Sequence, residues 1–262
     1  WLYICVRATK ARGNGGNYVK SFPKRRILTI LIPSVVMAIA YFVLKQYRYG
    51  YTLGALIYDF KRGASVISNG WYINAIIYFY IAFFISMLLC ELIKKRRIMI
   101  IFTFIFTYLY IFLCMKFKFE DHWFSAAFAF YFGILWAMFK SQIDSNLKKS
   151  IPIIIGCFFV FYYVLNVFAP FKYGWMEFKC LMYLAIIVIL GMRIKLQSPL
   201  MEWVGDHSLE IYLVHGLFFE ILRNNHINIV DNFEFMVTLL ILTFMSSYVL
   251  HKIFIFINKK II

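Results

Sequence analysis

One histidine in an apolar stretch is the residue of this sequence best suited to proton chemistry. Residues 198–225 begin with a Ser-Pro pair, and a mostly apolar run follows over residues 208–222. Ser208, Tyr212 and His215 are three or four residues apart, so a helix would place them on one face. A histidine inside an apolar helix faces protein or water rather than lipid. We therefore take His215 and Tyr212 as candidate catalytic residues, with His215 as a general base; the alternative for His215 is a hydrogen-bonded structural role.

Two glutamates flank His215 in the same run. Glu210 and Glu220 are each five residues from the histidine, which puts neither of them squarely on its helical face. We expect these carboxylates to be solvated at the two ends of the helix, and orientation of His215 is the alternative.

A second polar cluster joins two apolar runs and consists of Glu120, Asp121, His122 and Trp123. Two carboxylates and an imidazole beside an aromatic ring are suited to binding a sugar or to transferring a proton. We take Glu120 and His122 as candidate substrate-binding residues; the alternative is an interfacial loop with Trp123 in the aromatic belt. The spacing is not that of a zinc site, and no metal ion is expected.

Three basic residues lie directly before the first long apolar run. Lys24, Arg25 and Arg26 would lie against one membrane face. Their charges suit phosphate groups, such as those of an acyl-CoA or an anionic lipid. The alternative is plain anchoring of the membrane topology.

The composition indicates what kind of scaffold positions these residues. The chain has 262 residues, of which 63% are hydrophobic and 15% charged, and its mean hydropathy is +0.76. Soluble domains are about half apolar and about a quarter charged, so a multi-spanning membrane protein is expected. The net charge is +16, but Lys and Arg gather at the ends of apolar runs, which favours topology determinants over nucleic-acid binding. The five cysteines are far apart and are expected to be small packing residues.

The apolar runs predict an all-α bundle of about eight transmembrane helices. They lie at about 27–44, 71–90, 98–115, 123–139, 151–168, 178–192, 208–222 and 233–257. The short apolar piece 51–60 cannot cross a bilayer of about 30 Å and is expected to be re-entrant or interfacial. We therefore divide the chain into a polar basic segment, 1–26, and a membrane domain, 27–262.

Loop charges predict the orientation. Of the two alternating sets of loops, the set that contains residues 20–26 and 94–97 carries more Lys and Arg, and its loops are shorter. By the positive-inside rule both ends of this sequence are expected in the cytoplasm.

Four stretches in order resemble the acyltransferase type 3 family of membrane proteins. They are the basic segment 22–33, which ends at a proline; Trp71-Tyr72 with the aromatic residues that follow; Phe130-x-x-Gly133-Ile-Leu; and W-x-G-x-x-S-x-x-I-Y-L-x-H over residues 203–215. The resemblance covers about residues 20–260. It implies transfer of an acyl group, often acetyl from acetyl-CoA, to a sugar hydroxyl of a surface polysaccharide or glycolipid. It also implies a bacterial inner membrane, no bound cofactor, acyl-CoA binding by Arg25 and Arg26, and substrate binding by Trp71.

Two features depart from the family pattern. The family's first spans and their histidine are not seen ahead of the basic segment, and the sequence begins with Trp1, so we expect a fragment or an altered start. The family often has R-x-x-R before the proline, and here Arg26 is followed by Thr29. Two other functions stay open: a glycan or lipid transporter without catalysis, and an inactive remnant of the acyltransferase.

Overall fold

The computed structural model describes residues 15–62, 64–143, 173–193, 198–223 and 227–261, with a few further helical residues between 156 and 167. Within these ranges no β-strand forms, and an isolated antiparallel bridge joins Arg223 to Asn228. The described residues form two compact units. The first takes in those of Trp1–Pro23 and Tyr78–Leu196, and the second those of Lys24–Ile77 and Gln197–Ile262.

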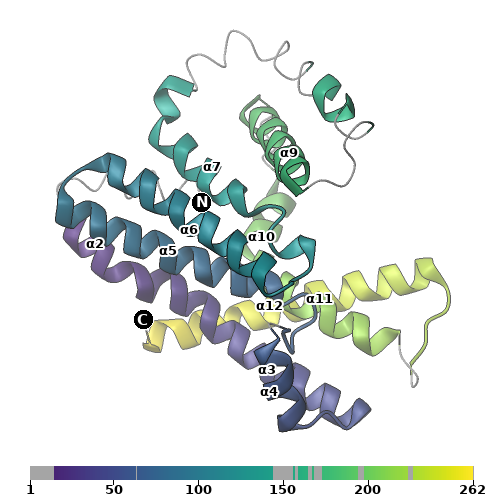
Figure 1. The fold of residues 1–262 in the computed structure, drawn as a ribbon. Helices are drawn as coiled ribbons and strands as arrows, with labels where there is room; N and C mark the ends of the chain where they lie inside the picture. The colour runs from purple at the N-terminus through teal and green to yellow at the C-terminus, as the bar shows by residue number, and fades with distance from the viewer. Residues whose placement is uncertain are drawn as a thin grey trace. The chain divides into compact units, whose positions relative to one another are not determined.

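The second unit carries most of the candidate residues. Its elements are most of the π-helical turn η1 (Pro23–Ile27), α3 (Leu28–Tyr49), α4 (Leu53–Lys61), the first residues of α5 (Trp71–Ile93), α10 (Pro199–Asp206), α11 (Ser208–Leu222) and α12 (Asn232–Ile261). Helices α11 and α12 pack side by side, and α11 also packs on α3 (Figure 1). Helix α3 is capped by Gly50, whose φ of 63° is left-handed and whose N–H donates to carbonyls of the last turn.

A compact apolar core joins α3 to α11 in this unit. Its buried members are Met37, Tyr41, Val66, Ile67, Ile73, Leu213 and Val214. The Tyr41 hydroxyl donates a hydrogen bond to the Leu213 carbonyl at 3.3 Å, so this buried polar group is satisfied by the backbone of the neighbouring helix. The core therefore contains residues of a non-helical segment, 64–70, as well as helix residues.

The connection between α3 and α5 separates into two parts. Helix α4 buries none of its residues, and the Thr52 side chain caps its first turn by accepting from the Ala55 N–H at 3.2 Å. With nine residues it is about 14 Å long, too short to span. The Tyr51 hydroxyl donates to Asp59 at 2.6 Å, and partial burial together with this hydrogen bond raises the pKa of Tyr51 to about 12. The part that enters the core is segment 64–70, which follows the predicted short piece.

The first unit is built from aromatic contacts between helices. Its elements are α2 (Gly15–Phe22), the greater part of α5, α6 (Arg96–Lys116), the 3₁₀ turn η2 (Asp121–Trp123), α7 (Ala127–Met138) and α9 (Tyr173–Arg193). The ring of Phe79 lies 5.0 Å from Tyr110 and 4.7 Å from Phe130, and Phe22 lies 5.5 Å from Phe83. Helix α7 packs on both α6 and α9.

The all-helical membrane architecture is confirmed, but the number of eight spans is not. In the described part of the chain four helices are long and apolar enough to cross a bilayer: Val19–Tyr49, Trp71–Ile93, Arg97–Lys116 and Asn232–Lys259. Helix α7, with 12 residues, and α11, with 15, form where spans were predicted but are shorter than a bilayer needs. Helix α9 covers the prediction at 178–192, and most of 151–168 lies outside the described residues.

Candidate functional site

A cavity of about 710 Å³ in the second unit brings together residues from three helices and one loop. It is lined by Ile30, Asn69, Trp71, Tyr72, Ile73, Ile76, Ser208, Leu209 and Tyr212. Ligand cavities commonly measure about 300–1,000 Å³ and combine apolar walls with a few polar groups. The cavity has this composition, and it joins the candidates Trp71 and Tyr212, which are far apart in the sequence.

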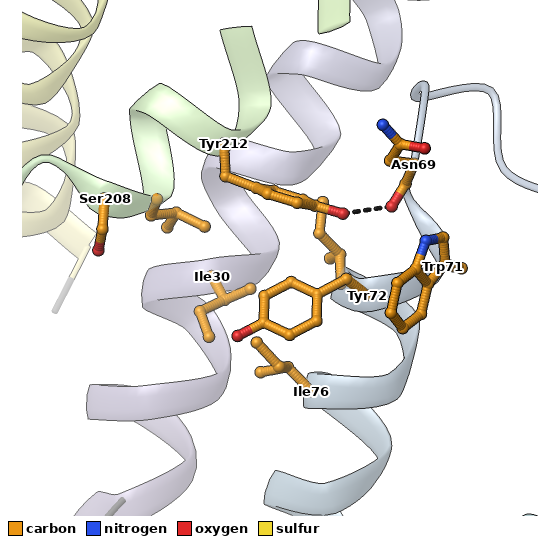
Figure 2. Close-up of a pocket in the computed structure, with 9 residues that line it drawn as sticks. Ile30, Asn69, Trp71, Tyr72, Ile76, Ser208 and Tyr212 are labelled. Atoms are coloured by element: carbon orange, nitrogen blue, oxygen red, sulfur yellow. Dashed lines mark hydrogen bonds between the residues drawn. The ribbon is translucent and has the colours of Figure 1, made fainter. Parts of the chain in front are cut away.

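Aromatic rings form the wall of the cavity. The ring of Tyr72 lies 5.1 Å from that of Tyr212 and 5.8 Å from that of Trp71. The Tyr212 hydroxyl donates to the backbone carbonyl of Asn69, as Figure 2 shows. The side chains of Asn69 and Ser208 are exposed and add an amide and a hydroxyl. Such a surface can stack on the C–H face of a sugar ring and hydrogen-bond its hydroxyls.

His215 lies beside this cavity without lining it. Its ring centroid is 5.6 Å from that of Tyr212, so the two residues are neighbours on α11 as their spacing predicted. Its Nδ1 lies 3.3 Å from the carbonyl oxygen of Ile211, one turn back on the same helix. A proton on Nδ1 would be donated to that carbonyl and would leave Nε2 as an acceptor, the form a general base needs.

The two candidate donor-binding arginines belong to η1, at the start of α3. Arg25 is exposed and Arg26 half-buried. The Thr29 hydroxyl donates to the backbone carbonyls of Arg25 and Arg26, at 3.0 and 3.1 Å. The guanidinium groups have no protein partner within the described residues. Arg26 lies four residues before Ile30, about one helical turn from the wall of the cavity.

Glu120 and His122 belong to the first unit. They contact each other, with His122 Nδ1 3.3 Å from Glu120 Oε2. The Glu120 side chain is 82% exposed and that of His122 46% exposed. This arrangement fits the interfacial loop and tests neither substrate binding nor proton transfer, so their role stays a prediction.

The expectation that Glu210 is solvated at a helix end is wrong. Its side chain is buried, and its Oε1 accepts from Nδ1 of His251 on α12 at 3.0 Å. The buried His207 stacks on Trp203 at 4.1 Å and lies 4.2 Å from the His251 ring. The hydrogen bond between Glu210 and His251 joins α11 to α12. It was not predicted from the sequence, because the residue pattern of one helix does not show a partner on another helix.

Glu220 is likewise held by protein groups rather than by solvent. Its Oε1 accepts from the Ser68 hydroxyl and lies 4.0 Å from Nζ of Lys45. Arg48 donates to the backbone carbonyls of Glu220 and Ile221. Within the described residues no three His, Cys, Asp or Glu side chains converge as a metal site.

Comparison with known proteins agrees with the four resembling stretches. The family model for the type 3 acyltransferase domain matches residues 8–252, nearly the whole chain. No curated protein and no solved structure matches it. With its apolar spanning helices and this match, the chain belongs to the type 3 family of membrane acyltransferases.

Proposed function

We propose that this protein transfers an acyl group, acetyl in the first instance, from acyl-CoA to a hydroxyl of a sugar in a surface polysaccharide or glycolipid. The observation that carries the proposal is the cavity in which Trp71 and Tyr212 meet, with Arg26 one helical turn from its wall. Membership of the family supports the acyl-transfer reaction, and the aromatic cavity supports a sugar as the acceptor.

Arg25 and Arg26 would hold the phosphates of the donor. Guanidinium groups bind phosphate oxygens through two parallel N–H donors, and these two side chains are available for it. Thr29 stands where the family often has a second arginine. Because its hydroxyl is used by the carbonyls of Arg25 and Arg26, it supports the backbone of the basic turn instead of adding a charge.

The acceptor sugar would lie in the aromatic cavity. Trp71 and Tyr72 offer ring faces, while Asn69 and Ser208 offer hydrogen-bonding groups at exposed positions. The Tyr212 hydroxyl is occupied by the Asn69 carbonyl, so we assign Tyr212 to shaping the cavity beside the reacting hydroxyl rather than to proton transfer. Glu120 and His122 are proposed as a separate contact for the polar acceptor.

His215 is the proposed general base. Its Nε2 would take the proton of the sugar hydroxyl as that oxygen attacks the carbonyl carbon of the thioester. The C–S bond then breaks, and the imidazolium returns the proton to the thiolate. The products are an ester on the sugar and free CoA, and the histidine is neutral again.

The proposal includes a location. The spanning helices and the family place the protein in a membrane. The family resemblance suggests a bacterial inner membrane, and the distribution of Lys and Arg among the loops supports an orientation with both ends of this chain in the cytoplasm. The donor would then bind from the cytoplasmic side, where acyl-CoA is made.

The test is acetyl transfer to surface glycan in cells that carry or lack the gene, with His215→Ala and Arg26→Ala variants. Both variants should lose most transfer, His215→Ala by about 10²-fold or more because a general base contributes about that factor. Arg26→Ala should raise the KM for acyl-CoA. Arg97→Ala, an exposed arginine at the start of α6, is the matched control for loss of one positive charge and should keep normal transfer. Unchanged glycan acetylation on deletion of the gene would exclude the enzyme and favour the transporter or the remnant.

A further inference from the structure

Segment 64–70 is the least regular part of the candidate site, and it carries Asn69 into the cavity. Val66 and Ile67 are buried in the core of the second unit. Asn69 has a φ of 61°, in the left-handed region that residues other than glycine seldom adopt. At membrane depth, non-helical backbone is tolerated only where it is buried in protein or lines a water-filled cavity, and a strained conformation persists only where its surroundings hold it. Something has to hold this segment in place.

One face of α11 makes hydrogen bonds to segment 64–70 at two points. Tyr212, Gly216 and Glu220 are four residues apart and therefore line up along one face of the helix. The Tyr212 hydroxyl binds the Asn69 carbonyl, and the Glu220 carboxylate binds the Ser68 hydroxyl. Two successive residues of the segment, Ser68 and Asn69, are thus held by α11 residues that lie about two turns apart.

Gly216 makes this close approach possible. A Cβ added there would lie 3.0 Å from the Cβ of Ser68 and 2.6 Å from Oη of Tyr41. Real Cβ atoms essentially never come within 3.0 Å of another atom, and a separation of 3.0 Å is already tighter than most of their contacts. Glycine at position 216 therefore lets the segment and α3 pack against this part of α11 without rearrangement.

The carboxylate of Glu220 is itself fixed by α3. Lys45 Nζ lies 4.0 Å from its Oε1, and Arg48 donates to the carbonyls of Glu220 and Ile221. The side chains of Lys45 and Glu220 are 22% and 19% exposed, so solvent screens this attraction less than it screens a surface pair. The Ser68 hydroxyl therefore donates to a carboxylate whose position is fixed by both α11 and α3.

We propose that Glu220 is a positioning residue for the acceptor cavity: through Ser68 it holds segment 64–70 so that Asn69 and Trp71 keep their places in the cavity wall. Glu220 touches no substrate in this assignment. The inference rests on the proposed function and deepens it, because it predicts an effect on the acceptor alone. Arg25 and Arg26, which would hold the donor, belong to η1, whereas Glu220 belongs to α11.

The kinetic test uses the full chain in lipid nanodiscs, with initial rates measured against acyl-CoA and against acceptor separately. Glu220→Ala and Ser68→Ala should each raise the acceptor KM by about tenfold, the size expected for loss of one hydrogen bond to a charged group. The KM for acyl-CoA should stay within about twofold. Glu220→Gln keeps an oxygen that can accept from Ser68 and should restore most of the acceptor affinity. Glu234→Ala, an exposed glutamate at the start of α12, should leave both constants unchanged.

A second measurement follows the segment without any activity. Asn69→Cys, placed in a chain whose five native cysteines are replaced by alanine, reports the accessibility of the segment by its rate of maleimide labelling. Adding Glu220→Ala should speed labelling several-fold, whereas adding Glu220→Gln or Glu234→Ala should not.

The outcomes separate the two claims. Unchanged labelling and an unchanged acceptor KM in Glu220→Ala would overturn the positioning role, and so would equal rises of both KM values. If the wild-type chain transfers no acyl group at all, the proposed function fails, and faster labelling would still establish that Glu220 holds the segment.

Discussion

Replacing Gly216 by alanine tests the closest packing in the second unit. In an unobstructed helix this change stabilises by about 1 kcal/mol, because alanine has the higher helix propensity. At Gly216 the new Cβ would meet Oη of Tyr41 at 2.6 Å and Cβ of Ser68 at 3.0 Å. Tyr41 is fully buried and its hydroxyl is bonded to the Leu213 carbonyl, so it cannot withdraw without losing that bond. Overpacking of this kind costs about 1–3 kcal/mol.

Gly205 supplies the matched control, because it is a helical glycine in the neighbouring α10 and a Cβ added there meets nothing within 4 Å. Gly205→Ala should therefore stabilise by about 0.5–1 kcal/mol, and Gly216→Ala should come out about 1–3 kcal/mol less stable than Gly205→Ala. The assay is reversible unfolding of the purified chain in mixed micelles with increasing dodecyl sulfate, followed by circular dichroism. Adding Tyr41→Phe to Gly216→Ala removes the nearest obstructing atom and should recover part of the loss. Equal stabilisation by both glycine variants would refute the close approach of α3 and segment 64–70 to α11.

Three further results are expected. Trp71→Ala should raise the acceptor KM about tenfold or more through loss of a stacking face, while Trp71→Phe keeps an aromatic ring and should retain most of the acceptor affinity. An acceptor KM equal to that of the wild type in initial-rate assays of Trp71→Ala would show that Trp71 does not bind the acceptor. His251→Ala should destabilise the protein by about 3–5 kcal/mol, because it leaves the buried Glu210 carboxylate without its partner. Adding Glu210→Ala should restore part of the stability in the same unfolding assay. A double variant less stable than His251→Ala would contradict the pairing. Tyr51 should titrate near pH 12, and Asp59→Asn should lower that pKa in an ultraviolet titration, since burial and the hydrogen bond to Asp59 both favour the neutral phenol. The contribution of the neutral Tyr51 to folding stability is then complete below pH 10 and is lost as the pH rises through 12. An unchanged titration in Asp59→Asn would count against the hydrogen bond.

Hydrophobic length was sufficient to predict the long helices. Runs of apolar residues at 71–90, 98–115 and 233–257 became α5, α6 and α12, because in a bilayer a helix satisfies every backbone group internally. The 3.6-residue period also placed Tyr212 and His215 on neighbouring positions of α11. These features depend on residues close together in the sequence.

The cavity and the partners of the two glutamates could not be predicted in this way. The hydrogen bonds from Tyr212 to Asn69 and from Ser68 to Glu220 join residues that are 143 and 152 positions apart in the sequence, and a local sequence pattern does not predict such contacts. Residues 64–70 lie outside every predicted apolar run, although burial of Val66 and Ile67 makes this segment part of the core. The signal that was available is Gly216, since a glycine inside an apolar helix indicates a close approach by another segment.

The length of α11 explains why both of its carboxylates have protein partners. Its 15 residues span about 22 Å, less than the apolar thickness of a bilayer, about 30 Å. Glu210 in its first turn and Glu220 near its last therefore cannot both reach the water outside an apolar layer of that thickness. An unpaired carboxylate within such a layer is costly, so each needs hydrogen bonds or opposite charge from the protein. His251 supplies this at one end, and Ser68 with Lys45 supplies it at the other. The two ends of this short helix are therefore both held by protein partners, and this fixes the position of Tyr212, which lies between the two glutamates, at the cavity.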